Sequence, residues 1–210
     1  MTSSSFLLDE ILRAPETDAV SIRILDAALG QYLAHGLRRT SVDDVARAAG
    51  IGRATVYRRF ATRDELIQAV LVRECRRFFA EIASATEALP TLADRLVEGF
   101  VVGLRGARRH SLLGRMLASE PEACLPFLTV QGGPVLGVVR EFLVHQYMTS
   151  PEVVNGSTGA RAVNPAEVAE ILVRLSISLV LTPDTCLALG TDEEVRATAR
   201  RYLAPLVTNR

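Results

Sequence analysis

Apolar side chains recur with a helical period along nearly the whole chain, and this pattern constrains the fold more than any other feature of the sequence. Within residues 165–181, for example, Val168, Leu175 and Leu179 lie on one side of a helix. No segment shows the alternation of apolar and polar residues that is typical of a half-buried strand. The pattern therefore predicts an all-α protein without a sheet.

Signals for helix starts and ends divide the chain into nine or ten expected helices. The break at Gly132-Gly133-Pro134 is either a plain loop or a hinge that opens space nearby, and a longer loop is expected over residues 149–163. The expected helices cover residues 18–35, 42–49, 53–60, 63–86, 91–106, 111–119, 122–131, 135–148, 165–181 and 192–205.

Two short helices joined by a tight turn are expected between Ser41 and Phe60. Ser41 and Asp44 have the spacing of a capping box at the start of the first of these helices. Gly50 ends that helix at a position that requires a positive φ. Together with the preceding helix over residues 18–35, this order predicts a three-helix bundle that contains a helix-turn-helix.

Positive charge is concentrated in the same segment. The whole chain has a formal net charge of zero, with 24 basic and 24 acidic residues. Residues 36–63 contain seven arginines and two aspartates, which sum to +5, so the remainder of the chain sums to −5. A basic block on a neutral chain is the electrostatic pattern of a nucleic-acid-binding module.

The second short helix has the composition of a helix that reads the major groove of DNA. Val56 and Phe60 share its inner side, whereas the outer side carries small, hydroxyl and guanidinium groups. Arg can donate two hydrogen bonds to guanine, and Thr can contact a thymine methyl group or a phosphate. The predicted DNA-binding residues are Ser41, Arg53, Ala54, Thr55, Tyr57, Arg58, Arg59 and Arg63.

Two questions about this basic surface stay open at the level of sequence. The sequence does not distinguish an arginine that contacts a base from one that contacts a phosphate. A solvated basic face on a helical bundle is the alternative explanation of the same charge, and it is the more common one for any single arginine. DNA binding is favoured because the turn, the caps and the sign of the charge agree.

Four motifs follow one another between residues 22 and 70. They are Ile24-Leu25-Asp26-Ala27-Ala28, Thr40-Ser41-Val42-x-x-Val45-Ala46, Ala49-Gly50-Ile51-x-Arg53-x-Thr55-x-Tyr57-x-x-Phe60 and Arg63-Asp64-Glu65-Leu66. Their order and spacing resemble the N-terminal signature of the tetracycline-repressor (TetR) family. The departures are small, since Gly52 stands where the family often has Ser, and Arg63 where it often has Lys.

The resemblance implies a homodimeric, all-α transcription regulator, usually a repressor, whose C-terminal part binds a ligand and forms the dimer. Residues 17–63 are then expected to be the helix-turn-helix DNA-binding domain, preceded by a flexible extension over residues 1–16. Residues 64–210 are expected to be a helical ligand-binding and dimerisation domain.

Two helices near the end of the chain are candidates for dimer formation. The helix over residues 165–181 is apolar on two faces and must be buried on both. Pairing it and the last helix with their two-fold mates in a four-helix bundle would bury the second faces, although both could instead complete the core of one protomer. The predicted interface residues are Ile171, Leu175, Ile177, Leu179, Val195, Tyr202 and Leu203.

The expected helices between residues 91 and 148 are candidates to enclose an effector. Their inner residues are apolar with few charges, which favours a hydrophobic small molecule. Apolar residues at helical spacing belong to a core more often than to a cavity, so each assignment stands beside that alternative. The candidate lining residues are Phe100, Leu104, Leu113, Met116, Leu117, Phe127, Val139, Phe142 and Leu143.

The sequence predicts no enzyme, no metal site and no cofactor. The motifs GxSxG, HExxH and GxGxxG are absent, and the lack of Lys excludes a Walker phosphate-binding loop. The three cysteines are scattered, and Glu141 with His145 is better explained as a solvated helix face than as a metal or acid–base pair. No apolar run approaches ~18 residues, so we expect a cytoplasmic protein without a membrane span.

These patterns together predict a ligand-responsive transcriptional regulator that binds a specific, palindromic operator in double-stranded DNA as a homodimer. We expect a repressor that a hydrophobic small molecule releases from its operator. The alternative is a helical scaffold or interaction protein whose basic face binds acidic partners and recognises no specific operator.

Overall fold

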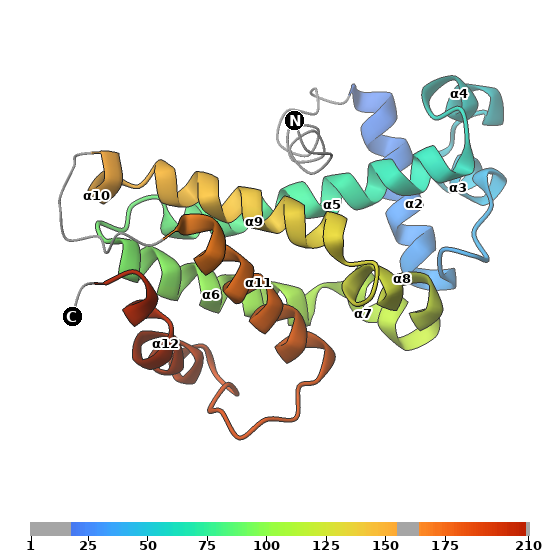
Figure 1. Ribbon diagram of the computed structural model, residues 1–210. Coiled ribbons are helices and arrows are strands. Elements are labelled where there is room, and N and C mark those ends of the chain that lie inside the picture. Colours follow the sequence, from blue (N-terminus) through green and yellow to red (C-terminus); the bar gives the residue numbers. More distant parts are fainter. Residues whose placement is uncertain (1–17, 155–163, 209–210) are drawn as a thin grey trace. The chain divides into compact units, whose positions relative to one another are not determined.

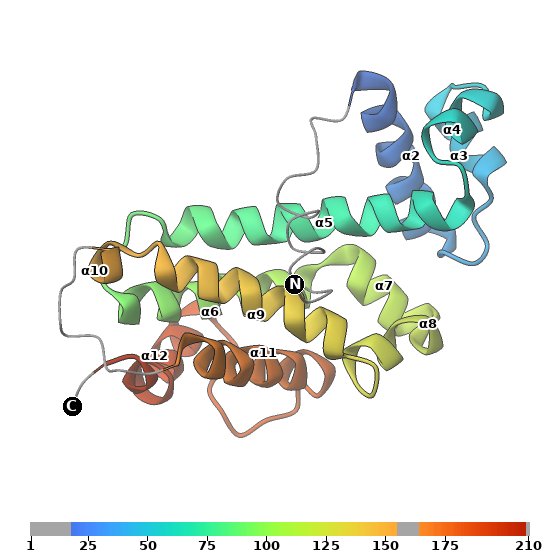
Figure 2. The ribbon, with the colours of Figure 1, turned by 45° about the horizontal axis from the view of Figure 1, so that its top comes forward.

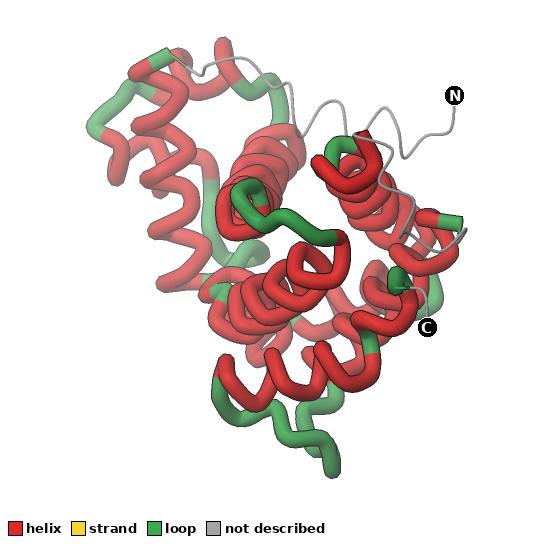
Figure 3. The backbone as a smooth tube through the Cα atoms, turned by 90° about the vertical axis from the view of Figure 1, so that its left-hand side faces the viewer, coloured by secondary structure: helices red, strands yellow, loops and turns green. Residues whose placement is uncertain are grey.

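The computed structural model describes residues 18–154 and 164–208, and every regular element within these ranges is a helix (Figure 1 and Figure 3). The prediction of an all-α fold is therefore confirmed. Contacts between residues divide the chain into two units. We call residues 18–77 with 110–126 the N-terminal unit, and residues 78–109 with 127–154 and 164–208 the C-terminal unit.

The N-terminal unit is built around three short helices and the first part of a long one. Helices α2 (Ala19–His35), α3 (Val42–Ala49) and α4 (Arg53–Arg59) precede α5 (Arg63–Thr86), of which residues 63–77 belong to this unit. The helix α7 (Ser111–Ser119) and the beginning of α8 (Pro121–Leu128) complete it. The buried core consists of Ile24, Leu25, Ala28, Tyr32, Leu37, Val42, Val45, Ala46, Val56, Leu66, Val70 and Leu112.

Local hydrogen bonds fix the ends of α3 as the sequence predicts. Ser41 and Asp44 form a complete capping box at its start. At its end, the Gly50 N–H donates to the Arg47 carbonyl and the Ile51 N–H to the Ala46 carbonyl, which is a Schellman motif. Gly50 adopts a φ of 63°, where a side chain would be strained. The turn between α3 and α4 is therefore held by main-chain geometry.

Thr62 and Glu65 cap the start of α5 without forming a complete capping box. The Thr62 hydroxyl accepts from the Glu65 N–H at 3.1 Å. The Glu65 carboxylate accepts from the N–H of Ala61 at 2.8 Å, and Ala61 lies one residue before the N-cap residue Thr62. The helix still begins at the expected position because both bonds close the first turn.

The C-terminal unit contains the rest of α5, then α6 (Leu92–Arg109), α9 (Gly133–Met148), α10 (Pro151–Val154), α11 (Pro165–Leu181) and α12 (Asp192–Tyr202), followed by a 3-10 turn at Ala204–Leu206. Helix α11 packs against both α9 and α6, and α12 packs against α6 (Figure 2). The largest buried cluster consists of Val97, Phe100, Val101, Leu104, Leu179, Leu189, Val195, Ala199 and Leu203.

Arginine side chains join α12 and the preceding loop to α6. Arg196 holds both oxygens of Glu98, at 3.0 and 3.2 Å, in a paired geometry that is stronger than a single contact. Arg105 reaches Asp192, the first residue of α12, at 2.5 Å. These bonds fix α12 on α6 and leave the apolar side of α11 to pack between α6 and α9.

The structure differs from the sequence prediction at several places. Helix α8 ends at Leu128, three residues before the expected end, because residues 129–132 form the turn that precedes Pro134. A short helix, α10, lies in the segment expected to be a loop, whose residues 155–163 are outside the described ranges, as is the expected extension 1–16. Residues 110–126 belong to the N-terminal unit and not with the rest of the expected ligand domain.

This last difference has a packing cause. Leu112 of α7 is 2% exposed and belongs to the same buried cluster as Ile24 and Val56. Met116, one turn further along α7, packs against that cluster. A segment 50 or more residues beyond the helix-turn-helix therefore supplies part of its core, which no local pattern could indicate.

Among the described residues, no single helix is long and apolar enough to cross a membrane. Only the bent pair of α8 and α9 reaches the required length and hydropathy when its two helices are taken together.

Candidate nucleic-acid interface

Helix α4 presents the two faces that its sequence predicts. Val56 is fully buried in the core of the N-terminal unit, and Phe60 packs against the same core. On the other side, Ala54, Tyr57 and Arg58 are exposed. The buried residues anchor the helix from behind, so the exposed side chains have a fixed orientation toward whatever docks on them.

Thr55 is less accessible than the prediction assumed, since it is only half-exposed. Its amide donates to the Gly52 carbonyl at 2.8 Å in the first turn of α4. Its side chain can still reach a ligand that approaches the outer face of the helix. It is a weaker candidate for base contact than its exposed neighbours Ala54 and Arg58.

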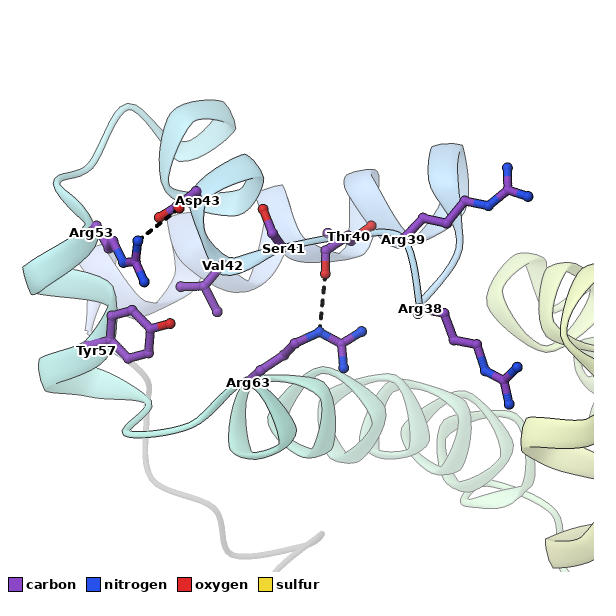
Figure 4. A pocket seen from close by; sticks show the side chains of 9 residues that line it. All are labelled: Arg38, Arg39, Thr40, Ser41, Val42, Asp43, Arg53, Tyr57 and Arg63. Carbon is purple, nitrogen blue, oxygen red and sulfur yellow. Dashed lines mark hydrogen bonds and ion pairs between the residues drawn. The ribbon is translucent and has the colours of Figure 1, made fainter.

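A pocket of about 270 Å³ opens beside α4, between the start of α3 and the start of α5 (Figure 4). Basic and hydroxyl groups surround the pocket, and groups of this kind contact the phosphates of a nucleic-acid backbone. Its lining residues are Arg38, Arg39, Thr40, Ser41, Val42, Asp43, Arg53, Tyr57 and Arg63. Four of the predicted DNA-binding residues, Ser41, Arg53, Tyr57 and Arg63, are thus brought together.

The arginines of this surface differ in whether their charge is already paired. Arg58 and Arg39 are exposed and make no ion pair or hydrogen bond with the described part of the chain. Arg53 pairs with Asp43 at 2.9 Å and lies over the ring of Tyr57, 5.3 Å from its centre. Arg59 pairs with Asp18, the N-cap residue of α2. Exposed pairs of this kind are weak and can exchange for a phosphate.

Arg63 has a different role from the one predicted for a DNA contact. Its Nε donates to the main-chain carbonyl of Thr40 at 3.2 Å, and Nη2 donates to the carbonyl of Leu37. Its remaining Nη1 lies 3.8 Å from the Asp64 carboxylate. Most of the guanidinium is therefore used to hold the loop between α2 and α3, although its charge still faces the pocket (Figure 4).

Ser41 lies at the N-terminus of α3, where main-chain donors favour an anion. Its hydroxyl accepts from the Asp44 N–H at 3.2 Å and donates to the Asp44 carboxylate at 2.6 Å. This hydroxyl bond is the main reason that the pKa of Asp44 lies below its usual value, with further help from the Ser41 N–H. The carboxylate and an incoming phosphate therefore compete for the same helix end.

Sequence reasoning missed Arg38, Arg39 and Thr40 as individual site residues. They lie in the loop that joins α2 to α3 and line the pocket. Thr40 is buried, and its hydroxyl donates to the Gly36 carbonyl at 2.8 Å, which closes the loop. The positive charge of residues 36–63 was the only sequence signal that pointed to the two arginines.

The predicted dimer residues divide into two groups. Ile171 on α11 is 50% exposed and Tyr202 on α12 is 55% exposed, and Leu175 and Ile177 are partly buried. Leu179, Val195 and Leu203 instead lie in the buried cluster of their own protomer, which leaves them as packing residues of α11, α12 and the turn after it. They have almost no surface left to bury against a second copy.

The predicted effector residues do not lie in one unit. Leu113, Met116 and Leu117 belong to the N-terminal unit, whereas the other six belong to the C-terminal unit. Phe100 and Leu104 are buried in the cluster that packs α6 on α12, and Phe142 stacks on Phe79 with ring centres 4.5 Å apart. Phe127 is 52% exposed. The structure thus assigns several of these side chains to packing.

Within the described ranges, no group of three or more His, Cys, Asp or Glu side chains could hold a metal ion. The donors that line the pocket are guanidinium, hydroxyl and main-chain groups. This donor set suits phosphates and guanine edges.

Comparison with known proteins points to one family. The family model described as "Bacterial regulatory proteins, tetR family" matches residues 24–70. An HTH-type transcriptional regulator of Mycobacterium tuberculosis is 29% identical over 203 residues, or 94% of this chain and 90% of the relative. The HTH-type transcriptional regulator AlkX of the same species is 25% identical over 98% of this chain and 95% of its own.

Solved structures agree on the fold. The TetR family repressor AlkX from Dietzia sp., implicated in biodegradation of n-alkanes, has a TM-score of 0.62 at 24% identity and covers 91% of this chain and 96% of its own. The Salmonella enterica protein GusR has a TM-score of 0.63 at 18% identity, over 91% of this chain and 97% of its own.

Proposed function

We propose that this chain, which belongs to the TetR family of DNA-binding transcriptional regulators, is a ligand-responsive repressor that releases a specific operator when a hydrophobic small molecule binds. The observation that carries the proposal is the geometry of α4. Val56 is fully buried, and the side chains opposite it, Ala54 and Arg58, are exposed. The outer face of the second helix of a helix-turn-helix thus carries a guanidinium that forms no ion pair with the described residues.

In this proposal α4 lies in the major groove. Arg58 is the candidate for a bidentate contact with guanine, because its charge is free and its neighbour Ala54 is too small to prevent close approach. Arg39, Ser41 and Tyr57 contact phosphates around the pocket. Arg53 and Arg59 join them by exchanging their exposed carboxylate partners for phosphate oxygens.

The proposed assembly on DNA is a two-fold dimer. Ile171 and Tyr202 support an interface on α11 and α12, since these large side chains are only about half covered within the protomer. A two-fold dimer places two copies of α4 on half-sites about one helical turn apart, ~34–36 Å, or a multiple of this. A palindromic operator follows from that symmetry. The complex forms in the cytoplasm, where bacterial DNA lies.

The proposed effector is apolar because the candidate lining residues in the C-terminal unit, such as Val139 and Leu143, are aliphatic or aromatic. Effector binding acts as a population shift between states with different separations of the two α4 helices. Helix α5 is the candidate carrier of this change, since it supplies residues to both units. A medium-chain n-alkane is a suitable first probe, because the Dietzia repressor with this fold is implicated in alkane biodegradation.

The direct test is a gel-shift or anisotropy titration with the DNA that flanks the gene, repeated with scrambled DNA and at several salt concentrations. We expect saturable binding to the native DNA, with log affinity falling steeply as log salt rises. Added alkane should weaken that binding. Equal affinity for native and scrambled DNA would instead support the rival function, a helical interaction protein whose basic face binds acidic partners without an operator.

A further inference from the structure

The segment from α7 to the start of α8 returns to the DNA-binding helices and contacts one end of α2. Three polar contacts connect the two. Arg115 donates to the Ala34 carbonyl at 3.3 Å, the Glu120 carboxylate accepts from the Arg38 N–H at 3.1 Å, and Glu122 pairs with the Arg38 guanidinium at 2.8 Å. All three contacts lie within the N-terminal unit and fall at the end of α2 or the first residues of the next loop.

Of these three contacts, the one from Glu120 is made by a buried carboxylate. The residue is 8% exposed, and its Oε2 is buried and has no hydrogen-bond partner among the described residues. Its Oε1 lies so close to Gly36 that a Cβ at that position would overlap it. Gly36 has a φ of 87° and a ψ of 163°, which a residue with a side chain avoids. The chain thus keeps a glycine where the carboxylate approaches.

Placing the Glu120 carboxylate here costs free energy, which another interaction must offset. The C-terminus of a helix carries partial negative charge, and Glu120 adds a full negative charge beside the end of α2. A buried acceptor without a partner adds a further cost. The Ser119–Glu120 segment is not held there by attraction to the helix end, and its clearest gain is the bond to the Arg38 N–H.

The same bond holds Arg38, a part of the Gly36–Ser41 loop that the hydrogen bonds of Arg63 and Thr40 do not hold. Arg63 fixes the carbonyls of Leu37 and Thr40, and the Thr40 hydroxyl binds the carbonyl of Gly36. None of these bonds reaches Arg38. The Arg38 N–H is bound by Glu120, and Arg38 directly precedes Arg39, which forms no ion pair with the described residues. In Figure 4 the Arg38 side chain points away from Tyr57 and toward α7 and α8.

We propose that Glu120 is a positioning residue for DNA binding, which holds the Gly36–Ser41 loop so that Arg39 and Ser41 meet the operator phosphates. The proposal rests on the proposed function, because its main readout is operator binding. Glu120 acts through the Arg38 amide and does not itself contact DNA. A residue that lies 82 positions from its partner in sequence thereby supports the DNA-binding surface from behind.

The chain supplies a matched control. Glu122 is two residues away, carries the same charge and contacts the same residue, but its side chain is 54% exposed and it binds only the Arg38 guanidinium. Exposed ion pairs contribute little. The comparison of Glu120→Ala with Glu122→Ala therefore separates loss of the main-chain bond from loss of a negative charge near Arg38.

The experiment measures operator affinity across salt and amide hydrogen exchange of the peptide spanning residues 34–42, in the full chain. For Glu120→Ala we expect about tenfold weaker binding, from the loss of a charge-assisted hydrogen bond. The slope of log affinity against log salt should become shallower by about 0.9, one phosphate contact, and residues 36–41 should exchange faster. Glu122→Ala should stay within about twofold on all three readouts.

Two further variants keep the outcome decisive. Glu120→Gln retains an acceptor for the Arg38 N–H and should restore most of the affinity and the slope. If Glu120→Ala does not fold, Glu120→Asp, one methylene shorter, takes its place and should reproduce the loss. Wild-type affinity and wild-type slope in the tested variant overturn the positioning role while operator binding stands. Failure of the wild-type protein to bind any operator instead rejects the proposed function.

Discussion

Arg63, the first residue of α5, donates from Nε to the main-chain carbonyl of Thr40 at 3.2 Å, and so ties α5 to the loop that precedes α3. A second bond reaches the Leu37 carbonyl. The side chain is 38% exposed, so its charge still faces the pocket while its donors are in use. Arg63 therefore connects α5, which contributes residues to both units, with the loop that carries Arg39.

Replacement of Arg63 should thus lower both stability and operator affinity. For Arg63→Ala we expect the unfolding free energy to fall by about 1–3 kcal/mol, the usual range for hydrogen bonds that involve a charged group. Arg63→Lys keeps the charge but cannot match the two-pronged geometry, so it should recover the affinity better than the stability. Urea unfolding followed by circular dichroism and DNA titration measure the two effects. Unchanged stability in Arg63→Ala would contradict the loop-holding role.

Arg58 should account for specificity more than for general affinity. Loss of a bidentate guanine contact costs about 1–3 kcal/mol of discrimination, so Arg58→Ala should weaken operator binding more than binding to scrambled DNA. Arg59→Ala is the control on the same helix. Arg59 already pairs with Asp18, so its removal should cause a smaller loss of affinity that is similar on both DNAs. Equal losses on both DNAs for Arg58→Ala would assign that residue to a phosphate.

The comparison of sequence and structure separates local from distant information. The caps at Ser41, Gly50 and Thr191 were predictable because each depends on partners within four or five residues. The two faces of α4 follow from the helical period alone. The partners of its arginines do not, because Asp18 lies 41 residues from Arg59 in the chain. Glu120 could not be predicted at all, since no pattern connects it to the loop.

The same reasoning explains the division of the predicted dimer residues. A helix apolar on two faces, such as α11, indicates burial on both sides but not by which partner. Leu179 and Leu203 proved to be covered by the protomer itself, through packing among α6, α11 and α12. Only the exposed fraction of each side chain, as at Ile171, distinguishes a surface that still needs cover.

Gly36 should tolerate no side chain. Its φ of 87° and ψ of 163° lie in a region that is essentially restricted to glycine, so Gly36→Ala should cost about 1–3 kcal/mol from the main chain alone. Overlap with Glu120 adds to this cost. Gly30→Ala, inside the helix that Gly36 follows, is the control, because a Cβ there meets nothing within 4 Å and should stabilise α2 by about 0.5–1 kcal/mol.

A double-mutant cycle can divide the Gly36 cost into its two causes. In the Glu120→Ala background, the overlap is absent and only the main-chain strain remains. The added cost of Gly36→Ala should then be smaller than in the wild-type background, by at least about 0.5 kcal/mol. If the two substitutions change the unfolding free energy in a strictly additive way, the Glu120 carboxylate does not overlap with a side chain at this position.

The proposed interface between two copies can be tested at Ile171. An arginine at this half-exposed apolar position of α11 would bury charge in a dimer but would remain solvated in a monomer. We expect Ile171→Arg to shift the protein toward monomer in analytical ultracentrifugation. Val130→Arg, at a side chain that is 91% exposed outside α11 and α12, should leave the association state unchanged. Persistence of the dimer in Ile171→Arg would remove this residue from the interface.

Tyr32 should make the N-terminal unit sensitive to alkaline pH. Its side chain is 1% exposed, and burial raises the pKa of its phenol to about 12, against a smaller opposing effect of the Arg63 charge. Because the folded-state pKa lies above the ordinary value of about 10, the neutral phenol contributes its full stability below pH 10. That contribution is lost as the pH rises from 10 toward 12, and at pH 11 the loss is about 1 kcal/mol.

Tyr32→Phe removes the ionisable group and keeps the ring. Its unfolding free energy should therefore fall less than that of the wild type between pH 10 and pH 12, when both are measured by urea unfolding at each pH. Tyr57→Phe is the control, because it removes a phenol hydroxyl from a side chain that is 36% exposed. The burial argument fails if Tyr32→Phe and the wild type lose stability in parallel over this range.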